Sequence, residues 1–275
     1  MSAFRVLADG ARVPALGLGT WGFGGREQPD DTRDDESVSA IQTAISLGFT
    51  HIDMAAEYGA GHCEELVGRA IQGADRGKLF VTTRVPRGSL SRRDLAASAQ
   101  ASLKRLGVDQ LDLLLVGWPN PEVPLRETMR ALEECYEEGL TAHIGVSNFS
   151  AQLMYEAQGY LRESWIAVNE SEFSLLDQKP RMELLPACRK TGVLLVAYRP
   201  LGHGILARPG NPFLDGVAER YGKTRSQVAL NWVVDQEGVA AVPKSGNPVH
   251  LMELAGATGW SLEAADREAL AGSFS

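Results

Sequence analysis

The sequence predicts an α/β protein, specifically a closed (β/α)8 TIM barrel that is preceded by an N-terminal β-hairpin. Short apolar runs alternate with amphipathic segments along the whole chain, which is typical of parallel strands joined by helical crossovers. The chain has 275 residues, and one such barrel typically needs about 250 residues. We therefore expect a single domain over residues 1–275.

We expect the turn of the hairpin at Asp9 and Gly10, and eight strands after it. The predicted strands are 15–21, 49–54, 79–85, 111–118, 142–148, 166–173, 193–200 and 239–245. Segments between them have apolar residues at a spacing of three to four and end in glycine, as helices do; examples are 35–48, 91–107 and 124–139. The Pro- and Gly-rich piece 203–213 is expected to be a long loop, and long loops on barrels are usually functional.

An open, doubly wound sheet is the alternative fold. However, the strand and helix patterns continue to the C-terminus, and no GxGxxG motif follows an early strand, as a dinucleotide-binding sheet would require. These observations favour the barrel.

The composition is that of an ordinary globular protein with an ample core, since 44% of the residues are hydrophobic and 23% are charged. The net charge of -8 and the scattered basic residues argue against a nucleic-acid partner, because phosphate binding requires a clustered basic face. A small-molecule substrate is the expected partner.

The three cysteines, Cys63, Cys135 and Cys188, show neither CxxC pairing nor metal-ligand spacing. We expect buried free thiols, a reducing cytoplasmic location and no metal site. The N-terminus lacks the basic and apolar regions of a signal peptide, and no apolar run approaches the ~20 residues that cross a bilayer. No membrane association is therefore expected.

In a barrel of this kind the C-terminal ends of the strands and the loops after them form the active-site face. Most residues that this rule selects are polar or aromatic where a purely structural strand would continue apolar. They are Trp21, Asp53, Tyr58, Arg84, Gly117, Trp118, Asn148, Glu170, Tyr198, Lys244 and Ser245.

The segment 48–61, GFTHIDMAAEYGAG, resembles the signature of the aldo-keto reductases, in which a strand ends in Asp and a Tyr follows five residues later. Asp53 and Tyr58 match that pair, and further motifs from GLGTWGFG to VPKSGNP occur in family order. The resemblance implies a TIM barrel that uses NADP(H) and is often monomeric, so we expect a monomer or a weak homo-oligomer. In that family Tyr is the acid, Lys lowers its pKa while paired to Asp, and His orients the carbonyl.

The sequence departs from this pattern at two catalytic positions. The strand that should end in Lys reads VTTRV, with Arg84, and the strand that should carry His reads LLLVGWP, with Gly117. Arg84 keeps the charge in a planar fork that could bridge Asp53 and Tyr58. Without the resemblance, Asp53 and Arg84 would equally fit an ordinary buried ion pair.

Gly117 removes a donor to the substrate oxygen and opens a space that we expect Trp21 and Trp118 to border. We therefore expect an unusual substrate rather than a simple sugar aldehyde, because family members with a substituted His act on conjugated double bonds. His62 and His203 lie in loops on the same face and are further candidates for the missing donor.

Two motifs match residues that hold the nicotinamide in the family. Ser147 and Asn148 in GVSNF align with the pair that binds the carboxamide, and Tyr198 in VAYRPLG aligns with the aromatic ring that stacks on the nicotinamide. The alternative is that residues 148–150 only start the helix after the fifth strand.

VPKSGNP resembles the family's site for the adenosine 2'-phosphate, with Lys244 and Ser245 as its charge and hydroxyl, which favours NADP over NAD. Glu170 stands where the family has a carboxamide-binding Gln, and His250 stands near the usual Arg. The added carboxylate of Glu170 would need a compensating cation such as Arg199.

The resemblance thus implies an NADP(H)-dependent oxidoreductase that reduces a carbonyl or a conjugated C=C or C=N group, with Tyr58 as the acid and Asp53 and Arg84 as its partners. Two alternatives stay open. One is a barrel enzyme for non-redox chemistry, such as a cyclase, dehydratase or isomerase, that uses Tyr58, Arg84 and Glu170. The other is a binding protein that senses NADP(H).

Overall fold

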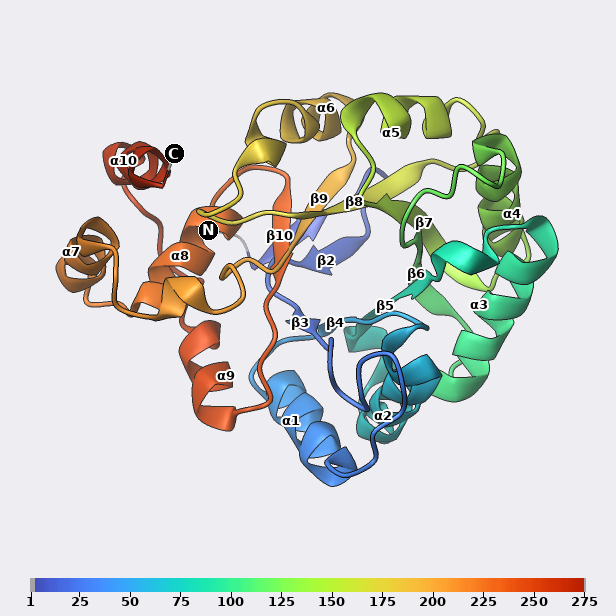
Figure 1. The fold of residues 1–275 in the computed structure, drawn as a ribbon, viewed down its shortest axis with the longest axis horizontal. Coiled ribbons are helices and arrows are strands. Elements are labelled where there is room, and N and C mark those ends of the chain that lie inside the picture. The colour runs from blue at the N-terminus through green and yellow to red at the C-terminus, as the bar shows by residue number, and fades with distance from the viewer. Residues whose placement is uncertain (1–2, 275) are drawn as a thin grey trace.

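The computed structural model describes residues 3–274. Eight parallel strands form one sheet in the order β10-β9-β8-β7-β6-β5-β4-β3, which lies at the centre of Figure 1 with helices around it. The strands are β3 Leu18–Gly19, β4 His51–Asp53, β5 Phe80–Val85, β6 Leu111–Val116, β7 Thr141–Ser147, β8 Ile166–Glu172, β9 Leu194–Tyr198 and β10 Val239–Val242. Each falls within or overlaps a predicted strand, so the sequence-based assignment is confirmed.

Backbone hydrogen bonds between the first and last strands close the sheet into a barrel. The amide of Gly17 donates to the carbonyl of Ala241 at 2.8 Å, and the amide of Gly19 donates to that of Pro243 at 2.9 Å. Gly19 permits this approach, because a Cβ there would lie 2.8 Å from the carbonyl oxygen of Val242. Closure leaves no open sheet edge.

The predicted N-terminal hairpin is present. β1 (Phe4–Val6) pairs antiparallel with β2 (Arg12–Pro14), and Gly10 takes a φ of 91° in the turn, a conformation that glycine adopts without strain. Leu7 and Val13 pack with the apolar side chains inside the barrel, so the hairpin closes one end of it.

Ten α-helices occur within residues 3–274. Each of α1 to α6 lies between two successive strands, α7 and α8 both lie between β9 and β10, and α9 and α10 follow β10 (Figure 1). Their bounds are α1 Asp34–Ser46, α2 His62–Ile71, α3 Arg92–Leu106, α4 Leu125–Glu137, α5 Ala151–Gln158, α6 Leu184–Thr191, α7 Pro212–Tyr221, α8 Arg225–Val234, α9 Pro248–Ala255 and α10 Ala264–Ser273. None of these helices is long and apolar enough to cross a membrane.

The prediction of a loop over 203–213 is wrong at its end. Pro212 and Phe213 begin α7, and the segment also contains a 3-10 turn at Ile205–Ala207. The helix starts here because the side chain of Asn211 accepts a hydrogen bond from the amide of Leu214 at 2.9 Å. Proline at the first helical position loses no hydrogen bond there.

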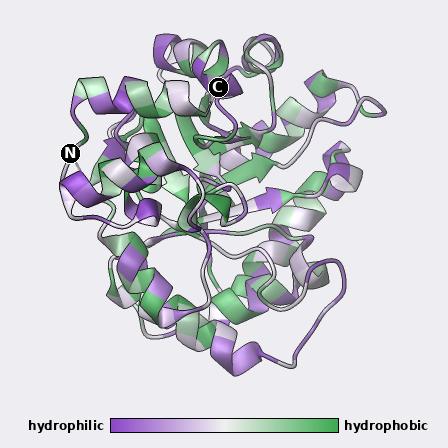
Figure 2. Cartoon of the chain, turned by 60° about the vertical axis from the view of Figure 1, so that its left-hand side comes forward, coloured by the Kyte–Doolittle hydropathy of each residue, from purple (hydrophilic) through white to green (hydrophobic). Residues whose placement is uncertain are grey.

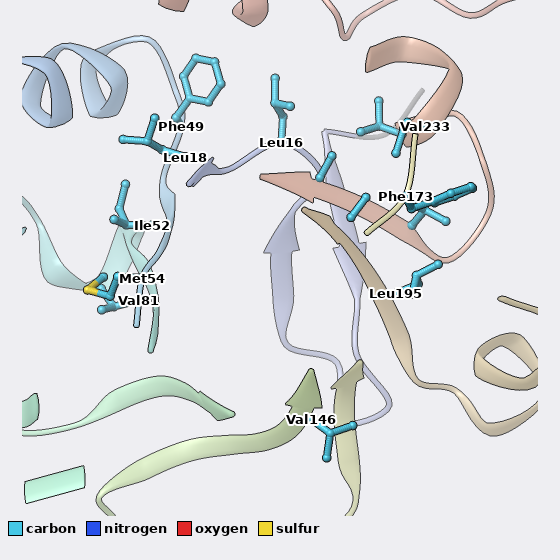
Figure 3. Close-up of a cluster of buried hydrophobic side chains, with 14 of the residues drawn as sticks. Leu16, Leu18, Phe49, Ile52, Met54, Val81, Val146, Phe173, Leu195 and Val233 are labelled. Atoms are coloured by element: carbon cyan, nitrogen blue, oxygen red, sulfur yellow. The ribbon is translucent and has the colours of Figure 1, made fainter. Parts of the chain in front are cut away.

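The period-two alternation of the strands divides the core into two layers. In β5, Val81 and Val85 belong to the larger layer between the barrel and the helices, whereas Phe80 belongs to the smaller layer inside the barrel. Figure 3 shows part of the larger layer, and Figure 2 shows hydrophobic residues concentrated on the strands. The predicted free thiols are confirmed, since Cys63, Cys135 and Cys188 are buried and unpaired.

The same alternation sets up the candidate site. Because alternate side chains share a face, Arg84 points to the inside of the barrel together with Phe80 and Thr82. Asp53 ends β4 next to Thr82 in the sheet register. Polar side chains therefore enter the barrel at the C-terminal ends of its strands, above an apolar interior.

Candidate functional site

A cavity of about 510 Å³ opens at the C-terminal ends of the strands. Most of the site residues that were predicted from the sequence line this cavity. Side chains that are far apart in the chain therefore meet at the strand ends, as predicted. The predicted residues that line it are Trp21, Asp53, Tyr58, Arg84, Gly117, Trp118, Ser147, Asn148, Tyr198, Arg199, Lys244 and, from the histidine candidates, His203.

Arg84 lines the base of this cavity, and the residue is only 9% exposed. Its two terminal nitrogens both donate to Asp53, from Nη1 to Oδ2 and from Nη2 to Oδ1, each at 3.1 Å. Nη2 also donates to the phenol oxygen of Tyr58 at 2.8 Å. Arg84 therefore bridges Asp53 and Tyr58, as we expected from the planar fork of its guanidinium.

Tyr58 is held by the turn that follows β4. Its amide donates to the carbonyl of Ala55 at 3.0 Å, and the amide of Gly59 donates to that of Arg26 at 2.7 Å. A Cβ on Gly59 would lie 2.2 Å from the carbonyl oxygen of Gly24, so only glycine fits. The glycine after Tyr58 thus ties this turn to the loop between β3 and α1.

The pKa of Tyr58 differs from the expectation that a cation would hold it down. Burial raises the pKa of this phenol to about 12; Arg84 lowers it, while Asp53 and Glu170 raise it. The desolvation of the phenolate and the two carboxylates together outweigh the guanidinium. Tyr58 consequently keeps its proton at neutral pH.

Glu170 lies beneath the cavity and is fully buried. Its Oε2 accepts a hydrogen bond from Nη1 of Arg84. The cation that compensates Glu170 is therefore Arg84, and the expectation that Arg199 would do so is wrong. Arg199 instead pairs with Glu172 at 3.0 Å, at the rim of the cavity.

Asn148 connects the ends of three strands. Its Nδ2 donates to the carbonyl of Gly117 at 3.0 Å and to Oγ of Ser147 at 3.0 Å, and its Oδ1 accepts from the phenol of Tyr198 at 2.6 Å. It does so with a φ of 65°, which is unusual for a residue other than glycine. The helix start is a separate feature, because Ser150 is the residue that caps α5.

The predicted phosphate-binding residues lie around the start of α9. Lys244 lines the cavity, with its ammonium 4.7 Å from the centre of the Phe23 ring. Ser245 is buried, and its Oγ accepts from the amide of Asn247 at 3.1 Å. His250 is exposed in the first turn of α9.

The two histidine candidates differ in their positions. His203 lines the cavity, 3.9 Å from Glu172. His62 starts α2 and is held between Asp34 and Glu65, each at 2.9 Å. His62 therefore joins α2 to the start of α1, outside the set of residues that line the cavity.

Sequence reasoning missed part of the cavity wall. Its further lining residues come from the end of β3, from the turn before Tyr58, from the chain after β9 and from the end of β10; they are Gly19, Thr20, Glu57, Pro200, Leu201, Gly204, Val242 and Pro243. The exposed Glu57 adjoins a predicted residue, so a rule that included whole turns would have found it.

The fold and this cluster define an α/β-barrel protein with a buried cation and a tyrosine at its mouth. The chain belongs to the aldo/keto reductase family, whose sequence model matches residues 15–272.

The alignments with individual relatives span most of this chain and most of each relative. The chain is 37% identical to an aldo-keto reductase of Mycobacterium sp. (strain JLS), over 88% of this chain and 82% of that protein. It is 33% identical to methylglyoxal reductase DkgB of Escherichia coli O157:H7, over 94% and 92%.

Solved structures match the whole barrel. The thermostable aldo-keto reductase Tm1743, crystallised with the inhibitor epalrestat, has a TM-score of 0.95 at 41% identity and covers 99% of this chain and 100% of its own. An aldo/keto reductase of Klebsiella pneumoniae in complex with NADP and acetate has a TM-score of 0.88 at 30% identity, over 98% and 94%.

The buried position of Arg84 predicts a pH-dependent loss of stability when its charge is removed. We expect Arg84→Met to lower the free energy of unfolding by about 3–5 kcal/mol near pH 8, because Glu170 and Asp53 would lose their buried cation. Burial raises the pKa of Glu170 well above its usual range even though Arg84 lowers it. Without Arg84 the pKa of Glu170 would rise further.

A carboxyl with a raised pKa in the folded protein binds a proton that the unfolded chain has released, so its contribution to stability is lost as the pH rises. The deficit of Arg84→Met should therefore shrink as the pH falls from about 8 to about 6. Urea unfolding at several pH values measures it. Arg92→Met, which removes an exposed partner of Glu134, is the control and should leave the stability close to that of wild type, because exposed ion pairs contribute little. Equal stability of Arg84→Met and wild type at pH 8 would contradict this account.

Proposed function

We propose that this protein is an NADP(H)-dependent oxidoreductase that reduces a carbonyl, or a conjugated C=C or C=N group, of a small organic molecule, with Tyr58 as the proton donor. The observation that carries the proposal is the hydrogen bond from Nη2 of Arg84 to the phenol oxygen of Tyr58. Because that oxygen accepts from Arg84, its own hydrogen is available to a substrate atom in the cavity.

The chemistry of the site follows from charge and burial. Reduction of a carbonyl needs a proton for the developing alkoxide, and the raised pKa of Tyr58 keeps that proton in place at neutral pH. When Tyr58 gives up its proton, the phenolate faces Arg84, whose charge and hydrogen bond stabilise it in a region with little water. Asp53 holds the guanidinium through two hydrogen bonds.

The residues around the cavity fit an NADP(H) molecule, which would supply the hydride. Tyr198 offers an aromatic ring, and Ser147 and Asn148 offer hydrogen-bonding groups at the same end of the cavity. Lys244 also lines the cavity, and the buried Ser245 follows it shortly before α9; an ammonium and a hydroxyl are suitable ligands for a phosphomonoester. We also propose Arg199, at the rim, and His250, in the first turn of α9, as cofactor contacts.

The relatives support this proposal, because they include methylglyoxal reductases and reductases crystallised with NADP or NADPH.

Gly117 supports a substrate with more bulk near the reacting atom than a simple sugar aldehyde. Gly117 lines the cavity, so the lack of a side chain beyond the Cβ position leaves room in the cavity; a Cβ itself would already be in tight contact with the carbonyl of Val85, at 3.2 Å. The exposed rings of Trp21 and Trp118 flank the same cavity. A flat, conjugated substrate would use both features.

Tyr58→Phe tests the role of the phenol. We expect it to reduce kcat by a factor of about 100 or more, the lower range for removal of a general acid, with stability and cofactor affinity nearly unchanged. The measurement is NADPH oxidation with a panel of aldehydes, ketones and enones, alongside thermal unfolding. Tyr155→Phe, on the exposed face of α5, is the matched control and should behave as wild type. Full activity of Tyr58→Phe would remove Tyr58 from the mechanism.

A titration of NADPH and NADH tests the cofactor. Quenching of tryptophan fluorescence should show tighter binding of NADPH, because Lys244 and Ser245 would contact its 2'-phosphate. Lys244→Met should weaken NADPH binding by about tenfold or more, the value of one hydrogen bond to a charged group, and should leave NADH binding unchanged.

Lys190→Met, on α6, serves as the control for that titration. Equal affinity for both cofactors would refute the phosphate site. Binding of neither would favour non-redox chemistry, whereas tight binding without turnover on any substrate would favour a sensor.

A further inference from the structure

We propose that Glu170 is a positioning residue for Arg84 and that the two side chains form one functional unit, so that a lysine can replace Arg84 only when Glu170 has also lost its charge. This inference rests on the proposed role of Tyr58 as the acid. The observation behind it is that one guanidinium is shared among Asp53, Glu170 and Tyr58.

All four hydrogens on the two terminal nitrogens of Arg84 have an acceptor in this arrangement. A guanidinium has two hydrogens on each terminal nitrogen. Nη1 donates to Asp53 and to Glu170, and Nη2 donates to Asp53 and to Tyr58. Asp53 thus occupies the inner edge of the fork, while Glu170 and Tyr58 occupy its two outer sides. Fixing Nη1 on Glu170 also fixes the direction in which Nη2 points to Tyr58.

Glu170 is placed to act through Arg84 and not on a bound molecule. Its side chain is fully buried, and it is absent from the lining of the cavity. Its Oε2 faces Arg84, and within residues 3–274 its Oε1 has no hydrogen-bond partner. The resemblance assigned this position to the nicotinamide carboxamide, but in the structure Glu170 is buried against Arg84 and does not line the cavity.

The sheet explains how two distant strands supply the pair. Arg84 lies near the end of β5, and Glu170 lies in β8 beside Ser147 of β7. In the sheet order, β6 and β7 lie between β5 and β8. The long side chain of Arg84 therefore reaches across the inside of the barrel to meet a second carboxyl, in addition to that of Asp53 on the neighbouring strand β4.

A lysine at position 84 would meet this site differently. It presents one nitrogen on a flexible stem, whereas the guanidinium presents a planar fork. An ammonium near Asp53 and Tyr58 would leave Glu170 as a buried carboxyl without its donor, and an unpaired buried charge is strongly destabilising. A glutamine at position 170 has the same shape without the charge. The two substitutions should therefore compensate each other.

A double-mutant cycle of Arg84→Lys and Glu170→Gln tests the pair. We expect Arg84→Lys alone to lose most of kcat/KM. The double variant should have a kcat/KM about tenfold higher than Arg84→Lys, a factor that corresponds to a coupling energy typical of residues in one hydrogen-bond network. The midpoint of thermal unfolding should likewise be lower in Arg84→Lys than in wild type and should partly recover in the double variant. Arg84→Lys combined with Glu172→Gln is the matched control, because Glu172 pairs with Arg199, and its effects should be additive.

Two readouts separate positioning from a purely structural role or a cofactor contact. Glu170→Gln should lower the pKa of the Tyr58 phenol, because the nearby carboxylate of Glu170 raises it; the signal is phenolate absorbance after subtraction of Tyr58→Phe. Glu170→Met, which offers no oxygen to Nη1, should lower kcat while the Kd of NADPH stays as in wild type. A raised Kd with unchanged kcat would make Glu170 a cofactor contact and overturn the inference.

The outcomes distinguish this inference from the proposed function. If wild type turns over and the cycle is additive in both kcat/KM and unfolding midpoint, the pairing is wrong and the reductase assignment stands. If wild type reduces nothing, the assignment fails, and the unfolding cycle and phenol titration still decide whether the pair is coupled. If Arg84→Lys alone does not fold and the double variant does, that rescue supports the pair; if neither folds, the compensation is refuted.

Discussion

The buried guanidinium of Arg84 is the interaction on which the arrangement of the site depends. One cation pairs with both Asp53 and Glu170 inside the barrel and donates to Tyr58. Each of these groups would be costly to bury alone, since a charge without a partner in the protein interior is strongly disfavoured. Together they fix the tyrosine at the base of a cavity, with its oxygen held and its proton free.

The barrel supplies the geometry that this interaction needs. Period-two alternation turns Arg84 inward between Val81 and Val85, which pack outward against the helices, and closure between Gly17 and Ala241 makes strands far apart in sequence face each other. The apolar interior below the site excludes water, which strengthens every electrostatic contact above it. Glu170 can then act on Tyr58 from the opposite side of Arg84 without contacting the cavity.

Much of this could be predicted from the sequence. Asp53, Arg84 and Tyr198 could be predicted as site residues, because they lie at the C-terminal ends of strands and a barrel places these ends on one face. The partner of Glu170 could not be predicted, because which inward side chains meet across a barrel depends on the tilt of the strands and the reach of each side chain. The sign of the pKa shift of Tyr58 was also inaccessible, since it depends on how burial compares with three nearby charges.

The most direct test of the central claim is a crystal structure of the protein with NADP and a small carboxylate, acetate for example, as a stand-in for the carbonyl oxygen of a substrate. The account predicts a carboxylate oxygen within hydrogen-bond distance of the Tyr58 phenol, with Arg84 still donating to Tyr58, Asp53 and Glu170. A structure in which Arg84 leaves Glu170 to bind the carboxylate itself, with Tyr58 turned away, would contradict it.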